Sequence, residues 1–227
     1  MAAATRRPRA PRNSLRRDAI LDAAVAVLDD GGPARLTMRS LAERLGVRPM
    51  ALYTYFGSKD ELLDAARDHV LGGLSAHRDA AHPDADEPDW VRRLRAVGLE
   101  LYRLLVAHPA LIHLFATRPL AGHEAAVATE EHLRVLRDAG FDRADAARAH
   151  LTLLQHALGS ATWEVQLNRG RDARSRQRRQ EALAALPADQ YPTLVDLTPE
   201  LVEGTVGEQQ FVYGVDVILA GLQERLK

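Results

Sequence analysis

The 227-residue sequence contains no cysteine. This absence excludes disulfide bonds, thiolate nucleophiles and zinc fingers with cysteine ligands, and it fits a reducing compartment. No stretch approaches the roughly 18 uninterrupted apolar residues that a membrane-spanning helix needs. The basic N-terminal segment is not followed by the apolar run of a secretory signal peptide. We therefore expect a cytoplasmic protein with no membrane partner.

Signatures of catalysis are also missing. The sequence has no G-x-S-x-G motif, no phosphate-binding glycine loop and no recognisable catalytic carboxylate pair. His123 and Glu124 begin an H-E-x-x pattern, but Val127 stands where a zinc protease needs its second histidine. We expect no enzyme activity, no cofactor and no metal; a helical enzyme or carrier that uses a pocket in the body is the alternative.

The net charge of −1 conceals an asymmetry along the chain. Residues 1–60 carry eleven basic and six acidic residues, a net charge of +5, and the remaining residues carry 19 basic and 25 acidic ones, a net charge of −6. A local basic field of this kind attracts nucleic acid whatever the total charge is. Residues 1–13, which are rich in Arg, Pro and Ala, are predicted to form a disordered basic arm.

Apolar residues recur at helical spacing nearly everywhere, and no stretch alternates with a period of two. Clear examples are Ile20, Ala24, Val27, Leu94, Leu101, Leu105, Leu154, Leu158, Ile218 and Leu222. We therefore expect an all-α fold, with helices that stop near Gly31, Pro109 and Gly140. A loose run is expected over residues 187–207.

Residues 37–56 have the pattern of a helix-turn-helix. Thr37 can cap a helix over about residues 38–44, and Gly46 can end it, because glycine enters the left-handed conformation at little cost. A second short helix is expected from Pro49 to Tyr55, because proline is tolerated in the first turn. Ser58 and Glu61 then form a capping box for a helix over residues 59–78.

A plain helical hairpin is the other interpretation of this pattern. The second helix, however, would leave Met50, Thr54 and Tyr55 on its outer face, beside Arg48. Exposed apolar and aromatic side chains are costly unless a partner covers them. Such residues serve DNA recognition in the major groove, where arginine donates to guanine and methyl groups contact thymine. We therefore expect residues 14–60 to form a three-helix DNA-binding domain.

The motif L-T-x-R-x-L-A-x-x-L-G-V-x-x-x-x-L-Y-x-x-F-x-x-K-x-x-L-L runs from Leu36 to Leu63 and resembles the signature of the TetR family of transcriptional regulators. This resemblance implies that Arg39 contacts a base and that Tyr53, Tyr55 and Lys59 contact phosphates. The full implied DNA-binding set is Thr37, Arg39, Arg48, Pro49, Met50, Tyr53, Thr54, Tyr55 and Lys59.

The body, residues 61–227, resembles the C-terminal domain of the tetracycline repressor. The similarity lies in Thr117-Arg118-Pro119, in Glu164 and in residues 211–227. It implies a ligand-binding and dimerisation domain in which two helices from each copy form a four-helix bundle. The residues implied to be buried in this homodimer are Leu151, Leu158, Val215, Ile218 and Leu222.

The same comparison places Leu114 where the tetracycline repressor has its metal-chelating histidine, with His113 one residue away. A step of one residue rotates a helical side chain by about 100°. We therefore expect a mostly apolar ligand rather than a metal-chelated one, although each residue could serve the core alone. The predicted ligand-binding residues are Val97, Leu101, Leu105, His113, Leu114, Phe115, Thr117, Arg118, Val127, Trp163 and Glu164.

These expectations describe a homodimeric repressor that binds a palindromic operator in double-stranded DNA. A small, mostly apolar effector would release it. A regulator whose ligand promotes DNA binding is consistent with the same residues.

Overall fold

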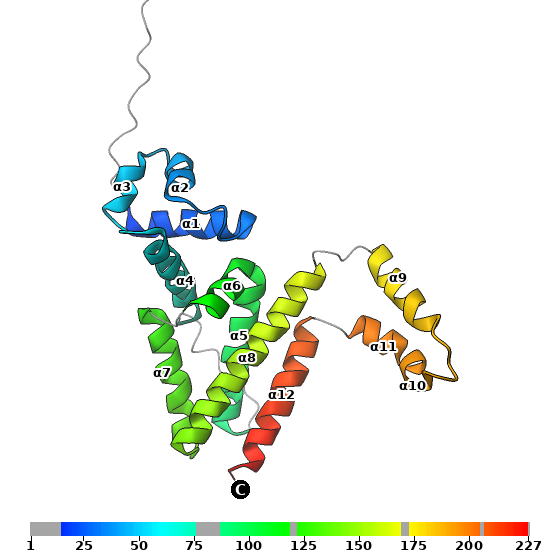
Figure 1. Cartoon of the computed structure of the whole chain (residues 1–227). Helices are drawn as coiled ribbons and strands as arrows, with labels where there is room; N and C mark the ends of the chain where they lie inside the picture. The colour runs from blue at the N-terminus through cyan, green and yellow to red at the C-terminus, as the bar shows by residue number, and fades with distance from the viewer. Residues whose placement is uncertain (1–14, 76–86, 119–121, 169–172, 205–206, 227) are drawn as a thin grey trace, which may run out of the picture. The chain divides into compact units, whose positions relative to one another are not determined.

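The computed structural model describes residues 15–75, 87–118, 122–168, 173–204 and 207–226. The arm predicted for residues 1–13 lies outside them. The regular structure of the described residues is helical, without a strand among them, so the predicted all-α class is confirmed (Figure 1). The chain divides into two compact units, Met1–Ala66 and Arg67–Lys227.

The first unit is a small helical domain. Its helices are α1 (Arg17–Gly31), α2 (Met38–Leu45), α3 (Pro49–Tyr53) and the first residues of α4 (Lys59–Ser75). Its core is formed by Ile20, Leu21, Ala24, Leu28, Leu36, Leu41, Leu52, Phe56 and Leu62. Gly32 ends α1 with a φ of 73°, and its N–H donates to the Leu28 carbonyl at 2.7 Å. The predicted three-helix arrangement is thus present.

The second unit is built around α8 (Arg143–Asn168), a helix of 26 residues. The helices packed against it are α5 (Asp89–Ala107), α6 (Pro109–Thr117), α7 (His123–Asp138) and α12 (Glu208–Glu224). Its buried face is mostly alanine: Ala146, Ala149, Leu153, Ala157 and Ala161. Because an alanine side chain ends at Cβ, neighbouring helices can approach α8 closely.

The break between α5 and α6 falls where Pro109 predicted a helix stop. Helix α5 ends at Ala107, and Pro109 occupies the first turn of α6. Within the described ranges, no single helix is long and apolar enough to cross a membrane. Helices α5 and α6 satisfy that test only as a pair, and the chain bends by 108° between them.

The loose run expected over residues 187–207 is wrong for most of its length. It contains α10 (Pro192–Asp196) and α11 (Thr198–Glu203), which pack with α9 (Ala173–Ala184). Each of the two short helices has a proline in its first turn, where the missing N–H costs nothing. These prolines therefore start helices rather than break them.

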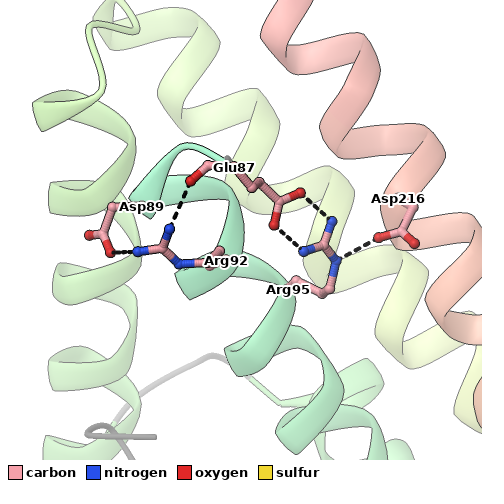
Figure 2. Close-up of polar contacts among 5 residues, drawn as sticks. All are labelled: Glu87, Asp89, Arg92, Arg95 and Asp216. Carbon is pink, nitrogen blue, oxygen red and sulfur yellow. Dashed lines mark hydrogen bonds and ion pairs between the residues drawn. The ribbon is translucent and has the colours of Figure 1, made fainter. Parts of the chain in front are cut away.

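A cluster of charged side chains fixes the start of α5 against α12 (Figure 2). The Arg95 guanidinium binds both carboxylate oxygens of Glu87 and donates from Nε to Asp216 of α12 at 2.6 Å. Arg92 donates to the Glu87 carbonyl at 2.8 Å and to Asp89 at 2.9 Å. The hydrogen bond from Arg95 lowers the pKa of Glu87, and the same bond raises the pKa of Arg95. Both groups therefore stay charged at neutral pH.

Helices α8 and α12 meet at a glycine. A Cβ at Gly214 would lie 2.4 Å from Cε1 of His156 and 2.6 Å from its Nε2. This imidazole stacks on Phe211, with ring centroids 5.1 Å apart, and its Nε2 lies 3.1 Å from the Phe211 carbonyl oxygen. Phe211 in turn stacks on Tyr102 of α5 at 4.4 Å. Three rings from three helices thus depend on the space that Gly214 leaves.

We predict that Gly214→Ala lowers the free energy of unfolding by about 1–3 kcal/mol, because the added methyl displaces the His156 ring. Urea unfolding at a fixed protein concentration measures the change. In a His156→Ala background the same substitution should be neutral or stabilising, because the methyl then has space and alanine favours a helix. An equal loss in both backgrounds would contradict this packing.

Candidate DNA interface and body cavity

Helix α2 begins and ends at the residues predicted from sequence. The hydroxyl of Thr37 accepts from the Ser40 N–H at 3.0 Å, and the hydroxyl of Ser40 accepts from the Thr37 N–H at 3.0 Å. These two bonds form a capping box. Gly46 ends the helix with a φ of 66°, in the left-handed region. The direction in which the chain enters α3 is therefore set locally.

Helix α3 is anchored by one side chain and exposes most of the others. Leu52 is fully buried, whereas Met50 is 73% exposed and Tyr53 is 45% exposed. The helix ends at Tyr53, two residues earlier than predicted, and the hydroxyl of Thr54 donates to the Ala51 carbonyl at 2.6 Å. The outer surface of α3 is thus available to a partner.

Two of the predicted arginines lie in the open beside this surface. The Arg39 side chain on α2 is 85% exposed and pairs with Glu43 one turn away at 3.0 Å. Arg48, which precedes α3, is also exposed. An exposed ion pair contributes only about 0–1 kcal/mol. The Arg39 guanidinium can therefore exchange Glu43 for another acceptor at little cost.

Tyr55 and Lys59 are half-buried, and each donates a hydrogen bond to a main-chain carbonyl. The hydroxyl of Tyr55 donates to the carbonyl of Leu15, and Nζ of Lys59 donates to the carbonyl of Pro33 at 2.7 Å. A phenol has a single proton to donate, whereas an ammonium group has three. Lys59 can therefore hold its carbonyl and still bind a phosphate, but Tyr55 as placed here has no second proton to give.

The start of α4 is capped by half of the predicted capping box. The hydroxyl of Ser58 accepts from the Glu61 N–H at 3.1 Å, as expected. The Glu61 carboxylate, however, accepts from the N–H of Gly57 at 2.7 Å. The carboxylate thus reaches one residue further back than a capping box requires.

The predicted ligand-binding residues are spread over four helices. They are Val97, Leu101 and Leu105 on α5, His113, Leu114, Phe115 and Thr117 on α6, Arg118 directly after it, Val127 on α7, and Trp163 and Glu164 on α8. Leu105, Leu114 and Glu164 are buried. His113 and Thr117 are exposed, and the Thr117 hydroxyl donates to the His113 carbonyl at 2.8 Å.

A cavity of about 330 Å³ lies between α5, α8 and α12. Its lining residues are Tyr102, Gln155, His156, Gly159, Ser160, Trp163, Gly207, Gln210 and Phe211. The lining combines the three stacked rings and the Trp163 indole with two amide side chains, one hydroxyl group and two glycines. Of the eleven residues predicted to bind a ligand, only Trp163 lines this cavity, and a ligand-binding role for all eleven stays a prediction. The cavity joins residues far apart in the chain, so no local pattern could reveal it.

The described residues include no group of three or more His, Asp or Glu that could hold a metal ion. Two histidines do meet: Nδ1 of His132 on α7 lies 2.7 Å from Nδ1 of His150 on α8. Burial lowers the pKa of His132 to about 4, and burial also lowers the pKa of His150. Two neutral imidazoles, one donating to the other, therefore hold α7 against α8.

Two family models match the chain. "Bacterial regulatory proteins, tetR family" matches residues 20–66, and "Tetracyclin repressor-like, C-terminal domain" matches residues 82–226. An HTH-type transcriptional regulator of Saccharopolyspora erythraea is 35% identical over 92% of this chain and 84% of its own length. The class C tetracycline repressor protein of Escherichia coli is 32% identical over 93% of this chain and 92% of its own.

Solved structures agree with these matches. The crystal structure of apo ActR from Streptomyces coelicolor superposes with a TM-score of 0.79 at 27% identity, over 96% of this chain and 98% of that one. ActR in complex with actinorhodin superposes with a TM-score of 0.77 at 27% identity, over 93% and 98% of the two chains. The likeness covers both units of the chain.

We predict that Tyr55→Phe lowers the free energy of unfolding by about 0.5–1.5 kcal/mol, because it removes the hydrogen bond to the Leu15 carbonyl. Tyr53→Phe is the matched control, since it removes the same hydroxyl from an exposed position and should leave stability unchanged. Thermal unfolding of both variants makes the comparison. Equal stability of the two variants would show that the Leu15 contact contributes nothing.

Proposed function

Because the chain belongs to the TetR family of transcriptional regulators, we propose that it is a homodimeric repressor that binds a palindromic operator and is released by a small, mostly apolar molecule. The observation that carries this proposal is the exposed surface of α3, held by a capped α2 and a left-handed glycine. A helix presented in this way can enter the major groove, which has room for an α-helix.

The proposed DNA contacts follow from where the side chains lie. Arg39 and Arg48 would donate to base edges, and Met50 would contact the methyl group of thymine. Tyr53 and Lys59 would bind phosphates, which position the protein without reading sequence. Four other predicted residues would support this surface without touching DNA. Thr37 caps α2, and Pro49 lies in the first turn of α3. The hydroxyls of Thr54 and Tyr55 donate to the carbonyls of Ala51 and Leu15.

The proposed dimer interface is the outer face of α8 and α12. Leu151 and Trp163 on α8 are exposed, as are Tyr213 and Val217 on α12, and Trp163 and Tyr213 are each more than 60% exposed. Apolar and aromatic side chains gathered on adjacent helices favour a covered surface. A two-fold dimer would bury the same face of both copies. Val215, which the resemblance places in the interface, is buried within its own chain.

A glycine in the middle of this face supports the same interface. Gly159 lies near the centre of α8 and is exposed, and a Cβ there would have no heavy atom of the described residues within 4 Å beyond its chain neighbours and the backbone of its own helix. Glycine in a helix interior costs about 1 kcal/mol relative to alanine. Among the described residues no side chain packs against this position, which leaves space for the close approach of a second helix.

The proposed effector binds in the body. The relative ActR is described in complex with (S)-DNPA and with actinorhodin, so a similar fold holds small molecules. The cavity of about 330 Å³ falls at the lower end of typical ligand pockets, about 300–1,000 Å³. Its lining shares Gly159 and Trp163 with the proposed dimer interface, so a second copy would complete its wall. Among the described residues, no Asp, Glu, Lys or Arg lines it, which favours an uncharged compound.

We predict that Arg39→Ala reduces discrimination between the operator and a scrambled sequence by about 1–3 kcal/mol. Lys59→Ala should weaken binding to both sequences alike and reduce the salt dependence by about one unit. Fluorescence anisotropy with labelled duplexes at several salt concentrations measures both effects.

The matched control is Arg93→Ala, because Arg93 also pairs with an acidic residue one turn away but lies on α5 of the body. This variant should bind both duplexes as the wild type does. If Arg39→Ala weakens binding to the operator and to the scrambled sequence by the same factor, as Lys59→Ala is expected to do, the base-reading role of Arg39 is wrong.

We predict that Gly159→Ala weakens self-association about tenfold, because its methyl group meets the second copy. Gly73→Ala is the control, since Gly73 is also an exposed helical glycine with space for a Cβ. That variant should gain up to about 1 kcal/mol of stability and associate as before. Sedimentation equilibrium and urea unfolding report the two quantities. A Gly159→Ala variant that gains stability and associates normally would place the interface elsewhere.

A further inference from the structure

The first turn of α7 is capped by a side chain from another helix. The residue at its N-cap position is Gly122, which has no side-chain oxygen to offer the free amides of that turn. Oδ1 of Asp68, on α4, accepts from the N–H of Ala125 at 3.1 Å. The carboxylate thus does what an N-cap side chain normally does, and its negative charge lies at the positive end of the helix dipole.

The backbone conformation of Gly122 and its lack of a side chain leave space for this carboxylate. Its φ of 143° is a conformation that side-chain-bearing residues rarely adopt. A Cβ there would stand 2.3 Å from Oδ1 of Asp68 and 2.6 Å from its Cγ. Glycine therefore serves both the backbone conformation and the close approach of α4.

A second contact lies one turn further along α4. A Cβ at Gly72 would stand 3.4 Å from Cγ of Glu124, in the first turn of α7. Asp68 and Gly72 are four residues apart and so share one face of α4. That face therefore lies against the start of α7 at two successive points.

In the proposed repressor, α4 carries a DNA contact and α7 packs against the helices of the effector cavity. Helix α4 runs without interruption from Lys59, a proposed phosphate contact, to Ser75 in the second unit. Helix α7 packs against α5 and α8, which line the cavity, and carries Val127, a predicted ligand residue. A bond between α4 and the start of α7 thus links the helix that carries Lys59 to a helix that packs against two of the cavity-lining helices.

We propose that the carboxylate of Asp68, seated on Gly122 and bound to the Ala125 amide, is the latch that holds α4 in the position required for operator binding. Asp68 acts as a positioning residue, since it touches neither DNA nor effector. An effector that moves the first turn of α7 would break this bond and free α4. The inference rests on the proposed repressor function, and the experiment below separates the two.

The test uses the full-length chain and an operator duplex selected by the wild-type protein from random DNA. Asp68→Ala should weaken operator binding about tenfold, while binding to a scrambled duplex at low salt stays within about twofold, because each DNA-binding unit remains intact. Asp68→Asn keeps an acceptor oxygen and should retain most of the affinity. Gly122→Ala should reproduce the Asp68→Ala defect from the other side of the contact.

Asp142→Ala is the matched control for a merely structural role. Asp142 caps the start of α8 by accepting from the Asp145 N–H at 2.7 Å, so its loss removes the same kind of bond from the same unit. This variant should lose stability but keep operator affinity. Amide hydrogen exchange at the first turn of α7 should accelerate in Asp68→Ala and not in Asp142→Ala.

Three outcomes decide between the claims. If the wild type selects no sequence, the proposed repressor function fails. If the wild type selects an operator and Asp68→Ala binds it equally well with faster exchange in α7, the latch is wrong. If Asp142→Ala weakens operator binding as much as Asp68→Ala does, the effect is general destabilisation and the latch is again wrong.

Discussion

The second unit depends on a row of small side chains along one face of α8. Ala146, Ala149, Ala157 and Ala161 are buried there, and they allow α5 and α12 to pack close to the backbone of α8. Gly214 on α12 likewise lets the His156 side chain of α8 lie close to the backbone of α12. The opposite face of α8 carries exposed side chains. One helix therefore organises the core of its own chain and, in the proposed dimer, would offer its other face to a second copy.

Features set by neighbouring residues could be predicted from sequence. The Thr37 cap, the left-handed Gly46 and the buried Leu52 each depend on residues within a few positions, and the structure has all three. Proline was less informative. It starts a helix in its first turn and stops one elsewhere, so Pro192 and Thr198–Glu203 belong to helices although the sequence predicts a loose run there.

Contacts between distant residues could not be predicted. The bond from Ala125 to Asp68, the pair of Arg95 with Asp216 and the ring stack of Tyr102 on Phe211 each join separate helices. Helical spacing shows which side chains are apolar along a face but not which partner covers them. The predicted ligand-binding set follows from the resemblance of the body to the tetracycline repressor. The cavity between α5, α8 and α12 shares only Trp163 with this set.

The central claim is that two copies of α3 together read a symmetric DNA sequence. Selection of bound duplexes from a random double-stranded library, at moderate salt and without added small molecules, tests it most directly. The account predicts a palindrome whose half-site centres lie about one helical turn apart, roughly 34–36 Å, or a multiple of it. Recovery of sequences with no shared preference, or of single half-sites without a symmetric mate, would contradict it.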